Sequence, residues 1–289
     1  MAEVECVVKS GDQLGEGPCW SAAEQRLYWF DIKGRKLSWF APADGACGAW
    51  PLPLRASAAA PRATGGLILA SEAGVAAFDT ATGELSILEP VELETGFRSN
   101  DGKIDALGRF WWSVMDDEGG RRPGHVYCKA PGQPSRRVLG GIHIPNTLAV
   151  SADCATLYIA DSKRQTLFAH AVEAACLELG EAREFAHTRG EDGTPDGSAL
   201  DAEGFLWNAQ WGAWRVVRYA PDGRIDRIVP MPVEQPTSCA FGGPDLDVLF
   251  VTSARDELSD EALTKQPLAG GLFALRPGVA GLPLPAFEG

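Results

Sequence analysis

The sequence predicts an all-β chain folded as a six-bladed β-propeller, and three observations support this fold class. An apolar triplet with the composition of a β-strand recurs six times, at spacings of 40 to 48 residues, starting at Leu27, Leu67, Phe110, Leu157, Phe205 and Leu249. Each repeat is rich in short strand patterns and in Gly, Asp and Pro turns, and a period in the forties with such units is typical of four-stranded blades. Helix signals are almost absent, the best being a turn or two from Ser259 as N-cap toward Pro267.

The repeats account for the whole chain, so we predict one domain over residues 1–289 rather than the two that this length allows. The segment 3–8 is rich in β-branched residues, and we expect it to join the last blade, near residues 271–275. Such closure removes an exposed sheet edge. The longest polar interruption, 115–124, predicts a loop over one face of the propeller.

A polar residue stands nine to eleven residues before five of the six triplets. These residues are Glu16, Asn100, Asn146, Asp196 and Ser238, while Ala56 holds the position in the second repeat. Because rotation about the central axis relates equivalent positions of successive blades, we expect these side chains to converge on one point. Two carboxylates and two amides would meet there.

Glu16, Asn146 and Asp196 offer only oxygen atoms, which suits a hard divalent cation such as Ca²⁺, Mg²⁺ or Mn²⁺ and disfavours a thiolate site. A cation placed there could polarise a carbonyl group or lower the pKa of a water, as in metal-assisted hydrolysis. The alternative is that these residues are ordinary turn residues, since Asp-Gly and Asn are common where strands end. The shared register of four such residues favours a site.

Composition excludes several other classes of protein. A formal charge of −13 leaves no basic patch for nucleic acid, and no apolar run reaches the length of a membrane span. The seven Cys residues are odd in number and form no CxxC pair, and no leader opens the chain, so we expect a cytoplasmic protein. The sequence has no G-x-S-x-G elbow of a serine hydrolase and no zinc-binding H-E-x-x-H motif.

Several motifs resemble those of the SMP-30/gluconolactonase/regucalcin family, and they occur in the family's order over nearly the whole chain. They are Leu14-Gly15-Glu16-Gly17-Pro18 with Trp20, Arg98-Ser99-Asn100-Asp101-Gly102-Lys103, Pro195-Asp196-Gly197, Thr237-Ser238-Cys239 with Phe241-Gly242-Gly243, Thr252-Ser253-Ala254-Arg255-Asp256, and Gln266-Pro267 with Gly270-Gly271. Any one of these motifs alone would be weak evidence for the resemblance, but the full set is specific to the family.

The resemblance implies a six-bladed propeller that binds one divalent cation in its central channel and hydrolyses a sugar lactone to the aldonic acid. Ca²⁺ is the first choice of cation, with Zn²⁺, Mn²⁺, Mg²⁺ or Fe²⁺ as alternatives. Glu16, Asn146 and Asp196 match the family's metal ligands, and Asp196 would also orient or deprotonate the attacking water. The family usually has Ser-Asn-Gly where this chain has Pro145-Asn146-Thr147, so the backbone around Asn146 is expected to differ.

Arg98 and Asn100 match residues that hold the substrate's ring oxygen and hydroxyl groups. Glu118 aligns with a family acid on the lid side, although Asp116 and Asp117 compete for that role. The expected partner is a small pentono- or gluconolactone, with a slight preference for the pentonolactone and with no nucleic acid or membrane.

Three alternatives to the lactonase stay open at this stage. A non-catalytic, calcium-binding regulatory propeller would bind metal without turnover. A scaffold propeller would present a large apolar surface patch for other proteins, but the G-H and W-D signature of interaction propellers is missing. An arylesterase or phosphotriesterase on a related propeller would need an apolar pocket in place of Arg98 and Asn100.

Overall fold

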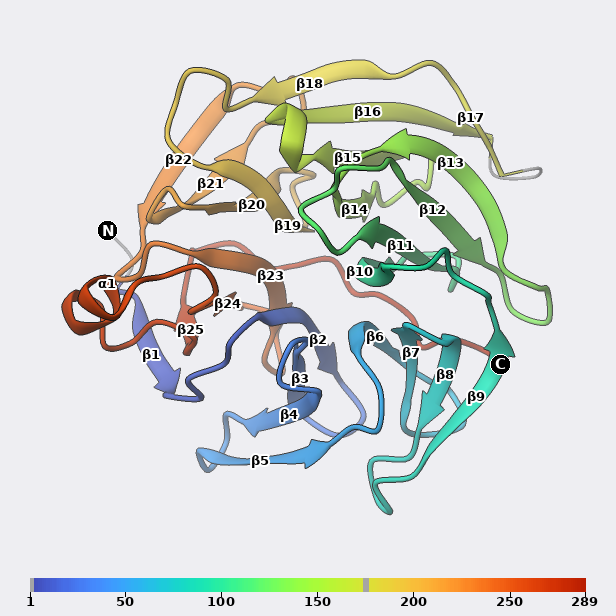
Figure 1. Cartoon of the computed structure of the whole chain (residues 1–289), viewed down its shortest axis with the longest axis horizontal. Helices are drawn as coiled ribbons and strands as arrows, with labels where there is room; N and C mark the ends of the chain where they lie inside the picture. The colour runs from blue at the N-terminus through green and yellow to red at the C-terminus, as the bar shows by residue number, and fades with distance from the viewer. Residues whose placement is uncertain (1–2, 174–176) are drawn as a thin grey trace.

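Six antiparallel sheets surround a central axis, so the chain is a six-bladed β-propeller, as predicted (Figure 1). The computed structural model describes residues 3–173 and 177–289. In the first five blades the first strand along the chain is innermost and later strands lie farther out, whereas in the sixth blade the first strand of the chain, β1, is outermost. The six predicted triplets fall at the second strand of each blade.

The first three blades follow chain order without interruption. Blade one contains β2 (Gly15–Ser21), β3 (Arg26–Asp31), β4 (Lys36–Ala41) and β5 (Ala46–Pro51). Blade two contains β6 (Ala56–Pro61), β7 (Leu67–Ser71), β8 (Gly74–Phe78) and β9 (Leu85–Pro90). Blade three contains β10 (Phe97–Ile104), β11 (Phe110–Asp116), β12 (Gly124–Lys129) and β13 (Arg136–Ile142).

The fourth blade has one additional short strand, and the fifth again has four. Blade four contains β14 (Pro145–Val150), β15 (Thr156–Asp161), β16 (Thr166–Glu173), β17 (Glu178–Leu179) and β18 (Arg183–His187), with the 3₁₀ turn η1 (Ser162–Arg164) after β15. Both β17 and β18 pair with β16. Blade five contains β19 (Thr194–Leu200), β20 (Leu206–Trp211), β21 (Arg215–Tyr219) and β22 (Ile225–Pro230).

The sixth blade joins the two ends of the chain. It contains β23 (Pro236–Gly242), β24 (Val248–Ser253), β25 (Leu272–Leu275) and, outermost, β1 (Glu5–Val8). Glu5 pairs with Ala274 and Cys6 with Phe273, which confirms the predicted closure.

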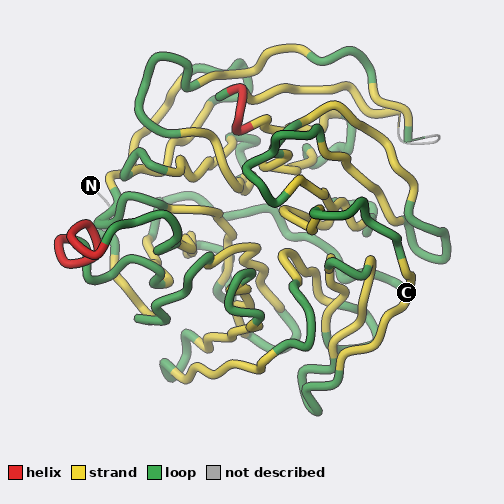
Figure 2. Tube along the Cα trace, in the orientation of Figure 1, coloured by secondary structure: helices red, strands yellow, loops and turns green. Residues whose placement is uncertain are grey.

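Helix α1 (Asp260–Lys265) lies at the rim of the propeller, outside the strands (Figure 2). Ser259 is its N-cap and accepts a hydrogen bond from the Ala262 N–H, as the sequence predicted. No helix within residues 3–173 and 177–289 has the length and apolar character needed to cross a membrane.

The hydrophobic core is divided into packets between neighbouring blades. Side chains alternate between the two faces of a strand, so each blade contributes to the packet on either side. In β3, Tyr28 and Phe30 pack toward blade two, whereas Leu27 and Trp29 pack toward Phe250 of blade six. Burial on both faces explains why the strands read as apolar triplets rather than as an alternating pattern.

Every innermost strand has an irregular register with its neighbour, at the position where the polar ring was predicted. These irregularities lie between Glu16/Cys19, Ala56/Ala58, Ser99/Gly102, Asn146/Ala149, Pro195/Ser198 and Pro236/Ser238. A β-bulge re-aims side chains and interrupts strand pairing. The six inner strands surround the centre of the molecule (Figure 1), so the bulges occur at equivalent places around the channel.

Candidate functional site

Four of the predicted ring residues lie on four different inner strands, and nearly all of their surface is buried. Glu16 is on β2, Asn100 on β10, Asn146 on β14 and Asp196 on β19, and each is between 5 and 7% exposed. Burial of polar side chains is unfavourable unless they have partners. The contacts of these residues therefore indicate what the site is built to hold.

Asn100 links two of the predicted site residues directly. Its side-chain amide donates to Asn146 Oδ1 at 2.8 Å and to the Pro145 carbonyl at 3.1 Å, while its own Oδ1 accepts from Arg98 at 2.7 Å. Asn146 in turn donates from Nδ2 to Ser162 Oγ at 2.9 Å. This chain of hydrogen bonds fixes both amide orientations and directs Asn146 Oδ1 toward the neighbouring blade.

Arg98 is held in place by Asp117, which the sequence suggested only as a competitor of Glu118. Asp117 accepts from Arg98 Nε at 2.6 Å through one carboxylate oxygen and from Arg55 at 2.6 Å through the other. Arg55 also pairs with Glu72 at 2.7 Å. Arg98 is therefore oriented on one side by Asp117 and on the other by Asn100.

Glu118 lies away from the buried site, on an exposed loop. Its side chain is 67% exposed in the loop between β11 and β12, where it pairs with Arg121 at 2.6 Å. A role for Glu118 in binding substrate stays a prediction. Asp116, the other competitor, pairs with Arg122 at the base of the same loop.

Both carboxyl groups of the ring have a raised pKa. Burial raises the pKa of Glu16 to about 8, with a further contribution from the nearby Asp101 carboxylate. Burial also holds the pKa of Asp196 well above its usual range, and repulsion from Glu16 and Asp101 adds to this effect. Glu16 accepts a hydrogen bond from the Gly17 N–H, but neither ring carboxyl has an ion-pair partner among the described residues.

This electrostatic situation fits a divalent cation. Burial and neighbouring carboxylates make both groups resist ionisation, although Arg98 lowers both pKa values and Lys103 that of Glu16, and a bound cation would remove that resistance. Within residues 3–173 and 177–289, no three His, Cys, Asp or Glu side chains form a metal-binding cluster. The candidate donor set instead combines Glu16 and Asp196 with the amide oxygen of Asn146.

Asp101 and Thr147 are buried site residues that the sequence analysis did not single out. Asp101 Oδ1 accepts from the Gly102 N–H at 2.7 Å, its Oδ2 is buried with no partner of ordinary hydrogen-bond geometry among the described residues, and burial raises its pKa. Thr147 directly follows Asn146 and has a φ of 79°, which is unusual for a β-branched residue. Asp101 stands next to Asn100 in the sequence, so its proximity to the ring could have been recognised there.

Comparison with known proteins gives a consistent result. A model of the SMP-30/gluconolactonase/LRE-like region matches residues 14–255. The chain belongs to this family. It is 36% identical to a 6-deoxy-6-sulfogluconolactonase of Pseudomonas putida, with 99% of both chains covered. It is 38% identical to an L-arabinolactonase of Azospirillum brasilense, over 96% of this chain and 92% of that one.

A solved structure from the same family has nearly the same backbone. It is described as a calcium-binding protein, regucalcin, from Agrobacterium tumefaciens, and it superposes with a TM-score of 0.94 at 34% identity. The match covers 99% of this chain and 98% of that one. The six-bladed propeller expected from the family resemblance is thus confirmed.

Proposed function

We propose that this protein is a metal-dependent hydrolase that opens a sugar lactone to the aldonic acid. The observation that carries the proposal is the pair of buried carboxyl groups, Glu16 and Asp196, beside the Asn146–Asn100–Arg98 hydrogen-bond network. The pair favours a cation, and the network offers donors for hydroxyl groups next to it. The lactonase names of the two bacterial relatives support the same substrate class.

We assign Glu16, Asn146 and Asp196 as the groups that hold the cation. All three would bind the cation through oxygen atoms, which makes Ca²⁺ the first choice and leaves Zn²⁺, Mn²⁺, Mg²⁺ and Fe²⁺ as alternatives. A divalent cation bound there would polarise a carbonyl group and make a nearby water more acidic. The description of the Agrobacterium neighbour as calcium-binding supports Ca²⁺.

Arg98 and Asn100 are proposed to bind the ring oxygen and hydroxyl groups of the lactone. Asp117 and Asn100 already fix the Arg98 guanidinium, so little side-chain entropy is lost when substrate binds. Glu118 would contribute from the loop after β11 if that loop folds over the bound sugar.

Asp196 is proposed to orient the attacking water and accept its proton. The water oxygen forms a bond to the carbonyl carbon, the bond from that carbon to the ring oxygen breaks, and the ring oxygen leaves as a hydroxyl group after it gains a proton. One water is consumed and one carboxylic acid is formed. With a cation bound, the Asp196 carboxylate would be ionised and could accept the proton of a neighbouring water.

The two relatives named above act on lactones of different sizes, so a pentonolactone and a hexonolactone are both candidates. We retain a slight preference for the pentonolactone. The test is acid release, followed with a pH indicator, on a panel of pentono- and hexonolactones after chelation and after metal add-back. Turnover that requires metal is expected, whereas tight metal binding without turnover would favour a calcium-binding regulatory propeller.

A further inference from the structure

A cavity lies farther along the inner strands than the carboxylate ring. It has a volume of about 630 Å³, and residues that follow each ring position on the same strand line it, such as Pro18 to Trp20, Lys103 and Ile104, and Cys239 to Phe241. These residues stand one to four positions beyond the ring, and a strand rises about 3.3 Å per residue. The middle of this lining is therefore about 10 Å from the ring along the strands.

The C-terminal segment 282–286 forms one wall of this cavity. Its two ends are attached to the propeller by backbone hydrogen bonds, from Gly281 N–H to the Leu246 carbonyl at 2.9 Å and from Phe287 N–H to the Pro61 carbonyl at 2.8 Å. Between these points the segment reads Leu-Pro-Leu-Pro-Ala, and three of its side chains are exposed. The segment crosses behind the inner strands as the pale red trace in Figure 1.

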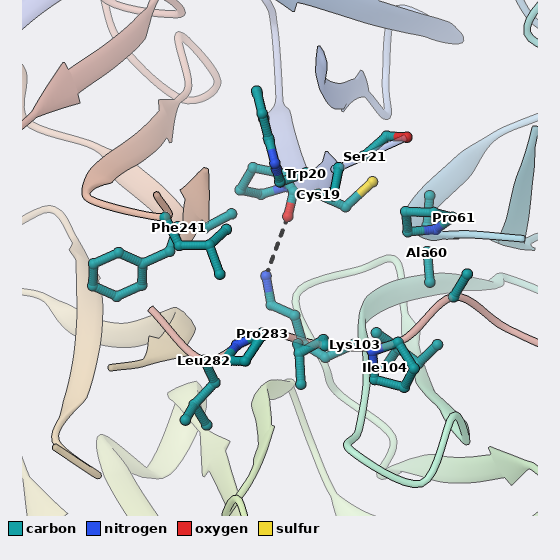
Figure 3. A pocket seen from close by; sticks show the side chains of 18 of the residues that line it. Cys19, Trp20, Ser21, Ala60, Pro61, Lys103, Ile104, Phe241, Leu282 and Pro283 are labelled. Atoms are coloured by element: carbon teal, nitrogen blue, oxygen red, sulfur yellow. Dashed lines mark hydrogen bonds between the residues drawn. The ribbon is translucent and has the colours of Figure 1, made fainter. Parts of the chain in front are cut away.

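Most of the remaining lining is apolar, and its charged side chains are Glu24, Arg62 and Lys103. Figure 3 shows the Lys103 side chain extending between Phe241, Pro283 and Trp20. Its ammonium group donates to two neutral acceptors, the carbonyl of Cys239 at 3.1 Å and that of Pro18 at 3.4 Å. No ion pair among the described residues includes Lys103.

An ammonium group has three donors and is unfavourable in an apolar cavity unless an anion accompanies it. Glu16 and Asp101 lie close enough to sense the Lys103 charge, but they belong to the ring side of the channel and neither contacts it. The Glu24 carboxylate of the lining already accepts hydrogen bonds from Thr80 Oγ1 and the Tyr28 hydroxyl, and Arg62 donates to the Gly289 carbonyl. Lys103 therefore presents a positive charge to the cavity with no salt-bridge partner among the described residues. The cavity volume is within the usual range of small-molecule sites.

We propose that this cavity is a second binding site, separate from the lactone site, for a small amphiphilic monoanion such as a medium-chain monocarboxylate. The carboxylate pairs with Lys103, and the hydrocarbon chain packs on Phe241, Leu282 and Pro283. A sugar lactone does not suit this site because its hydroxyl groups would lose water without gaining partners. The inference does not depend on the proposed function of the ring.

Calorimetric titration with octanoate tests this proposal, with 1-octanol as the uncharged probe of the same chain length. We expect one octanoate per chain, and Lys103→Met should weaken octanoate binding at least tenfold while octanol binding changes less than twofold. Lys265→Met is the matched control, since Lys265 pairs with Glu261 on helix α1 away from the cavity. Failure of the wild-type protein to bind octanoate, or equal octanoate affinity in Lys103→Met, would overturn the proposal.

Two further variants keep the test decisive. Pro283→Asp places a carboxylate on the exposed wall beside Lys103 and should weaken octanoate binding at least fivefold, even if Lys103→Met does not fold. Asp196→Ala should leave octanoate affinity unchanged, because that residue belongs to the ring. Loss of octanoate binding in Asp196→Ala would place the anion in the lactone site and contradict a second site.

Discussion

Thr147 Oγ1 donates a hydrogen bond of 2.8 Å to the main-chain oxygen of Asp196, which joins the two strands that carry Asn146 and Asp196. Thr147 Oγ1 also contacts Ser198 Oγ at 3.1 Å. The hydroxyl contacts explain how a threonine is accommodated at a φ of 79°, a backbone conformation that favours glycine. Backbone strain of this kind persists only where surrounding contacts enforce it.

We expect Thr147→Ala to destabilise the protein by about 1–3 kcal/mol and to weaken metal binding, because the substitution removes the hydrogen bond and retains the strained backbone. Thr147→Ser keeps the hydroxyl group and should remain close to wild type in both properties. Urea unfolding and calcium titration measure the two effects. Equal metal affinity in the alanine and serine variants would show that this contact does not position Asp196.

Asn100→Ala removes the residue that connects Arg98 to Asn146, and both partners then lose a buried hydrogen bond. We expect KM for the lactone to rise about tenfold or more and metal affinity to fall, since each lost bond is worth about 1–3 kcal/mol. Steady-state kinetics at saturating metal separate the two effects. A variant with a normal KM would contradict a role for Asn100 in substrate binding.

Asp117 and Glu118 are adjacent acids with different surroundings, and their amide variants form a matched pair. Asp117→Asn weakens the charge-assisted hold on Arg98, so we expect KM to rise several-fold. Glu118→Gln alters an exposed side chain that pairs with Arg121 and should change KM less. A larger rise in KM for Glu118→Gln than for Asp117→Asn would mean that the loop closes over the substrate and that Glu118 contacts it.

The raised pKa of Glu16 predicts how the stability of the metal-free protein depends on pH. Below about pH 4.5 the carboxyl group is protonated in both states. Between there and about pH 8 it ionises only in the unfolded state, so unfolding becomes easier as pH rises. We expect a loss on the order of a few kcal/mol over this window.

Glu16→Gln should flatten this dependence, and comparison of the urea unfolding midpoints of the two metal-free proteins at pH 5 and pH 8 isolates the contribution of Glu16. Metal binding requires the ionised carboxylates, so stabilisation by added Ca²⁺ should increase with pH over the same range. Identical pH profiles for wild type and Glu16→Gln would refute the assignment of the raised pKa.

The sequence was sufficient to predict the fold because a propeller repeats one physical unit. Strands buried on both faces give apolar triplets such as the one at Leu27, and their spacing fixes the number of blades. The closing pair β1–β25 and the capped helix α1 also follow from local signals at residues 3–8 and at Ser259.

The candidate site was only partly predictable. Rotation about the axis brings equivalent positions together, and for this reason Glu16, Asn100, Asn146 and Asp196 could be named without a structure. The ion pair between Asp117 and Arg98 depends on the backbone path of the loop that follows β11. The repeat pattern does not predict the conformation of that loop. The apolar cavity at Lys103 was also missed, because the C-terminal segment that closes it lies outside the repeat.

We propose that Asp196 both binds the cation and accepts the proton of the attacking water. The most direct measurement compares Asp196→Asn with wild type in calcium affinity and in acid release from a pentonolactone at saturating calcium. The asparagine retains an oxygen donor but cannot accept a proton, so we predict that calcium still binds, more weakly, and that kcat falls at least a hundredfold. Full turnover by the calcium-loaded Asp196→Asn protein would contradict this account.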